Sequence, residues 1–341
     1  MPETTPTLSA FFEAWDLFRE PALAGAVAGA LLGMLGIYVV LRRMVFLSAA
    51  LSQSASLGVS LAWFAQVRWS VPAWIASPTT GGTAASLLAA GAMLAGRSSL
   101  STRRDGVLGW VYLLGAAGTL AVGTRIVQEV QDIETLLFGS GVAVRPEDFT
   151  LLVQVSVVIG LLHLWLHRGF IQVATDQDGA RVRGLPTRLV DALLIVSLAV
   201  AVSVGTRILG ALPVFAFTVL PAMAALGLAV NVPQALPIAA LVGGACGFGG
   251  YLVAYRYRLP VGASQTLVAA LAVAAVHLLQ RALAAIVALR NRQRHDHNHE
   301  HGPDCGHPAV PHGDHVDYLV GGHLHHPDAE ECHDHGPLAG P

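Results

Sequence analysis

Long apolar runs separated by short polar connections occupy most of this chain. A helix needs about twenty mainly apolar residues to cross a bilayer core of about 30 Å. Such windows lie at 21–41, 44–67, 72–95, 106–126, 149–167, 189–205, 208–230, 233–255 and 263–289. Pro, Gly and Thr interrupt the third window, so either eight or nine spans are expected. The pattern predicts an all-α fold, a polytopic membrane helix bundle.

The pattern ends near residue 290, and the charge changes there as well. Residues 1–290 contain 18 Arg and 13 Asp or Glu, whereas residues 291–341 contain 2 Arg and 9 Asp or Glu. We therefore predict three parts: an N-terminal segment at 1–20, a transmembrane domain at 21–290 and a disordered tail at 291–341 that is rich in His, Asp and Cys.

The composition argues against an enzyme. Only 12% of residues are charged and the mean hydropathy is +0.58, against about 25% charged residues in soluble domains. All twenty basic residues are arginine, which excludes a phosphate-binding P-loop because that motif needs a lysine. The chain also lacks Gly-x-Ser-x-Gly and His-Glu-x-x-His motifs. We expect a conduit, with any ATP hydrolysis supplied by another subunit.

Arginine positions orient the spans, because short cytoplasmic loops are enriched in Arg and Lys. With nine spans and the N-terminus outside, Arg42 and Arg43, the arginines of 168–188 and those of 290–294 all fall inside. Arg256 and Arg258 disagree, since they fall outside. On balance the C-terminal tail is predicted to be cytoplasmic.

Small residues recur every four positions in two of the windows. Gly25, Gly29 and Gly33 form one such series, and Gly243 and Gly247 form another. Because this spacing lets helix backbones approach closely in lipid, it predicts a tightly packed bundle.

Two prolines interrupt the seventh window, "ALPVFAFTVLPAMAALGLA". Pro213 and Pro221 would remove backbone hydrogen bonds at membrane depth, which is tolerated where neighbouring helices or a water-lined cavity satisfy the freed groups. This helix either lines a pathway or contains a packing kink.

Few ionisable groups lie within the windows, where they usually mark ion paths. Asp191 lies at the start of one span. His163 and His167 are four residues apart, a spacing that suits a shared metal ion. The neighbouring Trp165 favours an interfacial or packed role instead.

The segment "DQDGARVRGLP", which begins at Asp176, interrupts the apolar pattern. Acidic residues at its start suit the helix dipole, and Gly184 followed by Pro186 would end a helix. We predict a short surface helix here, with a solvated connector as the alternative.

The tail holds 12 of the 15 histidines and two of the three cysteines. Neutral imidazole and thiolate suit zinc, nickel and copper, while the polar composition predicts disorder without a ligand. The candidate metal ligands are His295, His297, His299, His301, Cys305, His307, His312, His315, His323, His325, His326, Cys332, His333 and His335. No single site has fixed spacing, so we predict a multivalent metal-binding tail; the alternative is a solvated tail without a specific role.

Four groups of segments together carry a family resemblance. They are "LRRMVFLSAALSQSASLGVSLA", "LLFGSGVAVRPED", "ATDQDGARVRGLP", and "RILGALPVFAFTVLPAMAALGLA" with "YRLPVGASQTLVAALA". In this order the chain resembles the permease subunit of zinc/manganese/iron-type ABC importers. The resemblance implies a permease homodimer around a central path, in a bacterial inner or plasma membrane. Each permease would be docked on a cytoplasmic ATPase, and an extracytoplasmic metal-binding protein would deliver the ion.

The resemblance also implies an ATPase-coupling helix within a cytoplasmic loop at about 168–190. The residues matched to this role are Asp176, Gly179, Ala180, Arg183 and Gly184. This interpretation agrees with the missing lysine, because ATP hydrolysis would then come from the partner.

Three positions depart from the family pattern. Where relatives commonly read Gly-Asp-Ala-Leu-Ser-His, this chain has Ala49 in place of Asp and Gln53 in place of His. Arg258 stands where the family has an acidic residue. Hydroxyls and one amide could still line a polar, hydrated route, since transient passage needs only weak contacts. The predicted path residues are Ser48, Ser52, Gln53, Ser56, Pro213 and Pro221, with Ser54 beside them.

The leading hypothesis is therefore an ABC permease for a divalent transition metal, with zinc first and manganese or iron next. One alternative is an ATPase-independent secondary metal transporter or exporter with a His-rich extension. Another is a membrane-tethered metal buffer or sensor. No resident cofactor is expected, since the metal is cargo or bound to the tail, and the expected surroundings are membrane lipid rather than nucleic acid.

Overall fold

The computed structural model describes residues 7–72, 74–95, 101–126, 144–295, 305–312, 315–320, 323–327 and 332–337. The chain divides into two compact units, Met1–His277 and Leu278–Pro341. The first unit is a helix bundle and the second contains a small sheet.

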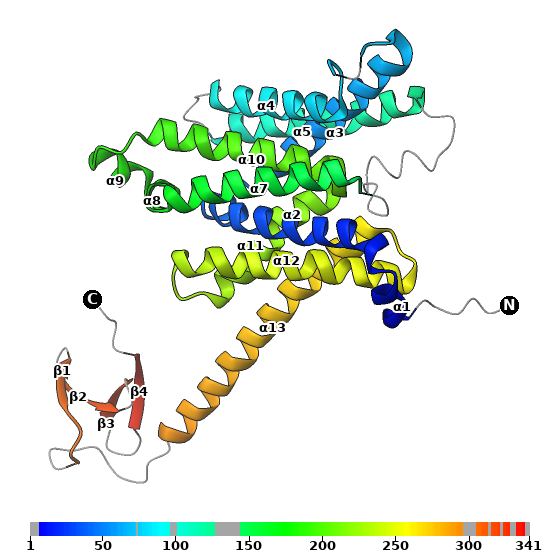
Figure 1. Ribbon diagram of the computed structural model, residues 1–341. Coiled ribbons are helices and arrows are strands. Elements are labelled where there is room, and N and C mark those ends of the chain that lie inside the picture. The colour runs from blue at the N-terminus through cyan, green and yellow to red at the C-terminus, as the bar shows by residue number, and fades with distance from the viewer. Residues whose placement is uncertain are drawn as a thin grey trace. The chain divides into compact units, whose positions relative to one another are not determined.

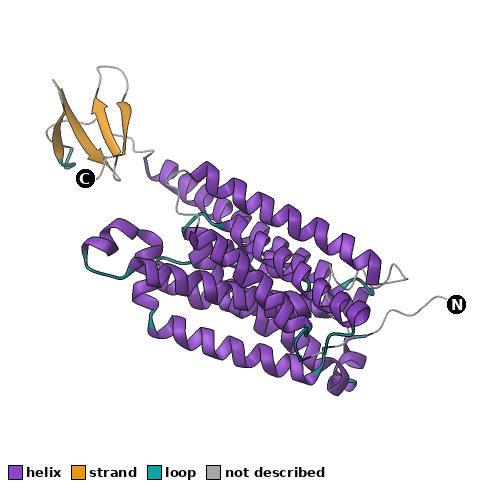
Figure 2. Ribbon diagram, turned by 90° about the horizontal axis from the view of Figure 1, so that it is seen from above, coloured by secondary structure: helices purple, strands orange, loops and turns teal. Residues whose placement is uncertain are grey.

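Long helices build the first unit, and most of them lie alongside one another (Figure 1 and Figure 2). They are α2 (Trp15–Leu41), α3 (Val45–Trp69), α4 (Pro78–Ala95), α5 (Ser101–Ile126), α7 (Pro146–Trp165), α10 (Thr187–Leu209), α11 (Ala211–Leu228), α12 (Val232–Tyr257) and the first part of α13 (Val261–His295). Among the described residues, three short helices accompany them: α1 (Leu8–Glu13), α8 (His167–Thr175) and α9 (Gln177–Val182).

Eight helices in the described part of the chain are long and apolar enough to cross a membrane. They are α2, α3, α5, α7, α10, α11, α12 and α13. The interrupted third window instead forms α4, an 18-residue helix that is not among the eight. The predicted membrane helix bundle is thus confirmed, with eight candidate spans.

The first span begins earlier than the sequence pattern predicted. Helix α2 starts at Trp15, with Asp16 in its first turn, and contains Pro21. The proposed N-terminal segment at 1–20 therefore includes α1 and the beginning of α2. Phe11 of α1 is fully buried and packs its ring against Tyr255 of α12, with 5.2 Å between ring centroids. This aromatic contact packs α1 against α12.

The two glycine series of the sequence meet each other. A Cβ built on Gly25 would approach the carbonyl oxygen of Gly247 to 2.9 Å, and one built on Gly29 would collide with the carbonyl oxygen of Gly243. Helices α2 and α12 therefore approach backbone to backbone, which is how small-residue spacing holds membrane helices together.

Helix α4 is held against α3 and α10 by small and polar residues. Gly58 and Gly81 face each other across α3 and α4. The hydroxyl of Ser86 donates a hydrogen bond to the Leu51 carbonyl at 3.0 Å, and the Thr83 and Ser203 hydroxyls lie 3.1 Å apart. Such contacts explain how a segment with lower hydropathy packs within the bundle.

Burial separates inner helices from outer ones. About two thirds of the most apolar window is buried in α2 (67%) and α3 (72%), against 17% in α7. The central residues include Leu35, Leu51, Val202, Val214 and Phe217. Apolar side chains therefore cover much of the exterior of α7, as expected for a surface that meets lipid.

The described residues of the second unit include a small sheet. An antiparallel four-stranded sheet runs in the order β1-β2-β3-β4. Its strands are β1 (Ala309–His312), β2 (His315–Val320), β3 (His323–Pro327) and β4 (Cys332–Pro337). The average composition of the tail does not show its short stretches of alternating polar and apolar residues. One such stretch is "HVDYLV", in which Tyr318 is buried. Alternation of this kind favours strands.

Candidate functional site

Helix α9 lies at one end of the bundle, between α8 and α10 (Figure 1). Asp176 is its N-cap, and the Asp176 carboxylate accepts a hydrogen bond from the Gly179 amide at 2.9 Å. A side-chain acceptor at this position satisfies a backbone donor that the helix leaves unpaired. The predicted short helix in "DQDGARVRGLP" is thus confirmed.

Glycines fit both ends of α9 for different reasons. A Cβ on Gly179 would collide with the capping carboxylate of Asp176. Gly184 has φ = +80° just beyond the helix, a conformation that glycine adopts without steric strain. The sequence therefore encodes both the start and the end of this helix locally.

Ala180 packs α9 against its neighbours, and Arg183 stabilises the capped turn itself. Ala180 is fully buried, so one face of the helix packs on the bundle. The Arg183 guanidinium donates a hydrogen bond to the Gly179 carbonyl at 3.1 Å and lies 3.9 Å from the Asp176 carboxylate. The five residues matched to the coupling role thus belong to one capped turn.

A polar network ties α9 to two long helices. The Gln177 amide donates to Asp191 Oδ2 at 2.8 Å, and Arg42 forms an ion pair with Asp191 Oδ1. Arg42 is the C-cap of α2, directly before α3, and Asp191 lies on α10. A displacement of α9 would therefore act on both α10 and the α2–α3 connection.

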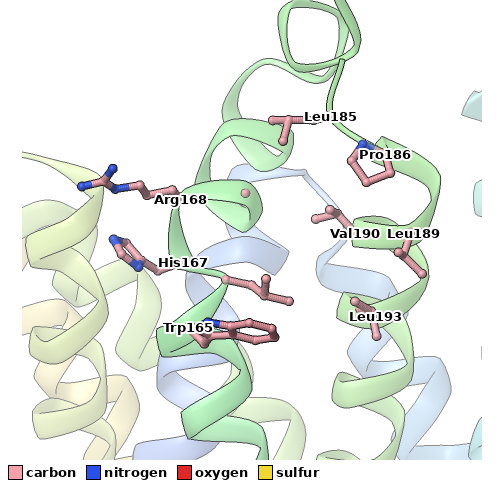
Figure 3. Close-up of a pocket in the computed structure, with 10 residues that line it drawn as sticks. Trp165, His167, Arg168, Leu185, Pro186, Leu189, Val190 and Leu193 are labelled. Carbon is pink, nitrogen blue, oxygen red and sulfur yellow. The ribbon is translucent and has the colours of Figure 1, made fainter. Parts of the chain in front are cut away.

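A largely apolar pocket of about 450 Å³ lies beside this end of the bundle (Figure 3). It is lined by Trp165, Leu166, His167, Arg168, Gly169, Leu185, Pro186, Leu189, Val190 and Leu193. The His167 and Arg168 side chains point away from the apolar residues of α10 (Figure 3). The pocket therefore lies between the α7–α8 junction and the segment that follows α9.

The predicted path residues of α3 fall into two groups. Ser48 and Ser52 are buried, and their hydroxyls donate to the α3 carbonyls of Val45 and Ala49 at 2.8 and 2.9 Å. In contrast, the Ser56 hydroxyl and Gln53 Oε1 are buried with no hydrogen-bond partner among the described residues. Buried polar atoms normally have hydrogen-bond partners. The oxygens of Gln53 and Ser56, three residues apart, are therefore more available to water or an ion than those of Ser48 and Ser52.

The two path prolines occupy unlike positions in α11. Pro213 is the third residue of the helix, where amides have no intrahelical partner in any case, so the prediction that it removes a hydrogen bond at membrane depth is wrong. Pro221 lies inside α11 and is buried. Its Cβ would lie 3.1 Å from a Cβ built on Gly33. Pro221 therefore lacks a backbone N–H donor inside α11, where α2 packs closely, although the helix continues through it.

His163 and His167 have separate partners. The His163 imidazole is buried, lies 2.8 Å from the Ser197 hydroxyl and stacks on Phe170 with 4.1 Å between ring centroids. His167 Nδ1 lies 2.9 Å from the Leu164 carbonyl oxygen. The packed role predicted for His163 is confirmed.

The tail ligands are distributed over both described and undescribed segments. His297, His299 and His301 lie outside the described residues. His295 ends α13, Cys305 and His307 precede the sheet, and the remaining candidates lie on strands. The strand residues are His312, His315, His323, His325, His326, Cys332, His333 and His335. Among the residues with described side chains, His315 and His326 come together with Asp317.

Sequence reasoning missed Asp317 as a candidate ligand, as well as the partners of Asp191. A usable signal for Asp317 was the alternation His-Val-Asp-Tyr, which places His315 and Asp317 on one face of a strand. No comparable local signal connects Arg42 with Asp191, which lies 149 residues further along the chain.

The candidate spans of the described residues, together with a family match, define a multi-pass membrane protein of the ABC permease class. The sequence profile described as "ABC 3 transport family" matches residues 14–280, and the chain belongs to this family. The match covers the described helices from α2 to α12 and more than half of α13.

Curated relatives and solved structures agree with this assignment. An uncharacterized membrane protein of Synechocystis is 26% identical over 76% of this chain and 89% of its own length. The manganese transport system membrane protein MntC of Bacillus subtilis is 26% identical over 71% of this chain and 57% of its own length. PsaBC from Streptococcus pneumoniae, solved in complex with Fab, has a similar fold, with a TM-score of 0.68 and 21% identity. That likeness covers 79% of this chain and 95% of the solved chain.

Proposed function

We propose that this chain is the membrane subunit through which an ABC transporter moves a divalent transition metal. The proposal is supported by the family match over residues 14–280 and by relatives named for manganese transport. The tail, with 12 histidines, favours zinc as the first cargo to test because imidazole is a preferred zinc ligand. Manganese and iron follow.

In this proposal a separate cytoplasmic ATPase supplies the energy. The chain contains no lysine and so cannot form the P-loop that binds ATP phosphates. Helix α9 is the proposed docking element. The observation that carries this assignment is the network from Gln177 through Asp191 to Arg42, because it offers a mechanical connection from α9 to α2 and α10.

The proposed assembly is a permease homodimer in a bacterial inner or plasma membrane. An extracytoplasmic metal-binding protein would deliver the ion on one side, and the tail would lie on the cytoplasmic side. Within each permease, Gln53 and Ser56 of α3 are the proposed polar contacts of the path, since their buried oxygens have no partner among the described residues. Ser48, Ser52, Pro213 and Pro221 would shape the same region without binding the ion tightly.

The proposal can be tested in proteoliposomes that contain the permease with a candidate ATPase, by measuring ATP-dependent uptake of radioactive zinc and manganese. Asp176→Ala removes the cap of α9, and we expect a several-fold loss of ATPase association and transport. Asp178→Ala is the matched control, since Asp178 is also acidic and near the helix start but pairs, among the described residues, with exposed Arg181. Uptake that needs neither ATP nor an ATPase would indicate a secondary transporter instead.

Deletion of the tail after His295 separates transport from metal buffering. The described part of α13 ends at His295, so this truncation retains the helix. The proposal expects ATP-dependent transport to survive, with reduced metal binding per chain. Loss of transport with an intact bundle would favour a membrane-tethered buffer or sensor.

A further inference from the structure

Strands β2 and β3 bring three metal-binding side chains together. His315 Nε2 lies 3.3 Å from Asp317 Oδ1, and His326 Nδ1 lies 3.1 Å from the same oxygen. The two imidazole centroids are 4.1 Å apart. One ligand atom from each residue can be chosen so that all lie within 4.8 Å of one another.

The strand geometry explains this cluster. Successive side chains of a strand point to opposite faces, so His315 and Asp317 share a face of β2. The register pairs Tyr318 with His325, and one step further along the ladder Asp317 meets His326. The pairing of β2 with β3 therefore brings these three side chains together, and no loop residue is needed to position them.

Burial makes the carboxylate of Asp317 unusual. The Asp317 side chain is 0% exposed, whereas the side chains of His315 and His326 are 31% and 22% exposed. A buried carboxylate is unfavourable unless it is paired with a positive charge or coordinates a metal. Both imidazoles contact Oδ1 of this carboxylate, and all three groups are of the kind that ligates metal ions. A divalent cation held by the three groups would stabilise the buried negative charge and could reach the cluster through the partly exposed imidazoles.

We propose that His315, Asp317 and His326 form a site for a divalent first-row transition metal. The ligands would be His315 Nε2, a carboxylate oxygen of Asp317 and His326 Nδ1, with a further position open to water or another donor. Two imidazoles and one carboxylate suit zinc and also ferrous iron. Tetrahedral zinc with bonds of about 2.0 Å separates its ligand atoms by about 3.3 Å, close to the two nitrogen–oxygen separations.

This site is one specific cluster within the tail for which the composition predicts multivalent metal binding. It has fixed ligands and a defined stoichiometry, and it is independent of whether the bundle transports a metal. Its failure and the failure of the proposed transport function are therefore distinguishable: a chain without transport can still bind metal here, and a working permease can lack the site.

The test uses the full-length protein in nanodiscs, stripped of metal and titrated with Co²⁺ and then Zn²⁺. His315→Gln/His326→Gln is compared with His297→Gln/His299→Gln, since each double variant removes two of the tail's 12 histidines and leaves ten. We expect the first variant to lose one tightly bound equivalent and the Co²⁺ ligand-field absorption assigned to it. The second should retain both.

Asp317→Asn is the sharper variant because it keeps the side-chain shape while removing the charge. Loss of even a supporting carboxylate typically lowers metal affinity about 10- to 100-fold, so the tightest Zn²⁺ affinity should fall at least about tenfold. Limited proteolysis of the metal-free proteins checks that the sheet persists in this variant. Unchanged stoichiometry, spectrum and affinity in the site variants would overturn the proposal. Equal losses in the His297/His299 variant would do so as well, since the tight site would then lie elsewhere in the tail.

Discussion

Arg42 and Asp191 form an ion pair that joins the end of α2 to α10. Their side chains are only 11% and 18% exposed, so water screens the pair weakly. The second oxygen of Asp191 accepts a hydrogen bond from Gln177 of α9. A single carboxylate thus connects the proposed docking helix with the segment that leads directly into α3, where the candidate path residues lie.

Replacing Asp191 with Asn should uncouple α9 from the bundle. Asn removes the charge that pairs with Arg42 while keeping the size of the side chain. Loss of a hydrogen bond to a charged group corresponds to about 1.5–3 kcal/mol. We expect a several-fold fall in ATP-dependent transport while the protein remains folded, measured as uptake alongside thermal unfolding in detergent.

The exposed pair of Arg181 and Asp178 supplies the control for that variant. Its side chains are 64% and 90% exposed, and exposed pairs contribute about 0–1 kcal/mol. Arg181→Gln should therefore leave the unfolding temperature unchanged. If both variants reduced transport equally with normal ATPase association, the Arg42–Asp191 connection would have no special role.

Close packing of α2 on α12 predicts a stability effect at Gly29. A Cβ at this position would collide with the Gly243 carbonyl, so Gly29→Val must separate the two helices. Overpacking of this kind costs about 1–3 kcal/mol, measurable as a lower unfolding temperature in detergent. Gly160→Val on α7 is the matched control, because a Cβ there meets nothing within 4 Å. A similar loss in both variants would point to helix propensity rather than packing.

Features encoded within one segment could be predicted from the sequence. Hydropathy located the spans because a membrane helix must be apolar over its own length, and four-residue spacing revealed the small face that contains Gly29. The caps of α9 were also readable, since Asp176 and Gly184 lie within a few residues of the helix. The coupling and path roles themselves stay predictions.

Features that depend on folding in three dimensions could not be predicted in this way. Asp191 was visible at the start of a span, but its partner Arg42 lies 149 residues away. The sequence pattern does not distinguish Pro213 from Pro221, whereas the start of α11 places Pro213 in the first turn. In the tail, the overall polar composition does not reveal the short alternating stretches that form strands. The convergence of His315 and His326 on Asp317 therefore could not be predicted from composition.

A second shielded ion pair predicts a stability effect at the start of α7. Asp148 Oδ1 lies 2.8 Å from Arg207 Nη2 of α10, and both side chains are 16% exposed. Asp148→Ala leaves Arg207 without this partner and should lower the free energy of unfolding by about 1–3 kcal/mol. Arg145 also contacts Asp148, at 3.1 Å, but its side chain is 65% exposed, so Arg145→Gln should change stability by under about 1 kcal/mol. Chemical denaturation in detergent measures both, and the reverse ranking would contradict this explanation.

Two serines of α3 offer a direct test of the path. The Ser52 hydroxyl donates to the Ala49 carbonyl in its own helix, whereas the Ser56 hydroxyl has no partner among the described residues. Ser56→Ala should therefore reduce metal uptake several-fold, because a group available to water or the ion is lost. Ser52→Ala should have a smaller effect, since it removes only a bond within the helix.

Both substitutions remove one hydroxyl from a buried position of the same helix, so differences in folding should be small. Unfolding temperatures in detergent check this point before uptake is compared at several metal concentrations. An effect on uptake that is larger for Ser52→Ala would contradict the assignment of Ser56. Gln53→Ala extends the test, since Gln53 Oε1 is also buried without a described partner. If Gln53 and Ser56 contact the same ion, the double variant should lose less than the sum of the two single effects, as expected for residues that act together.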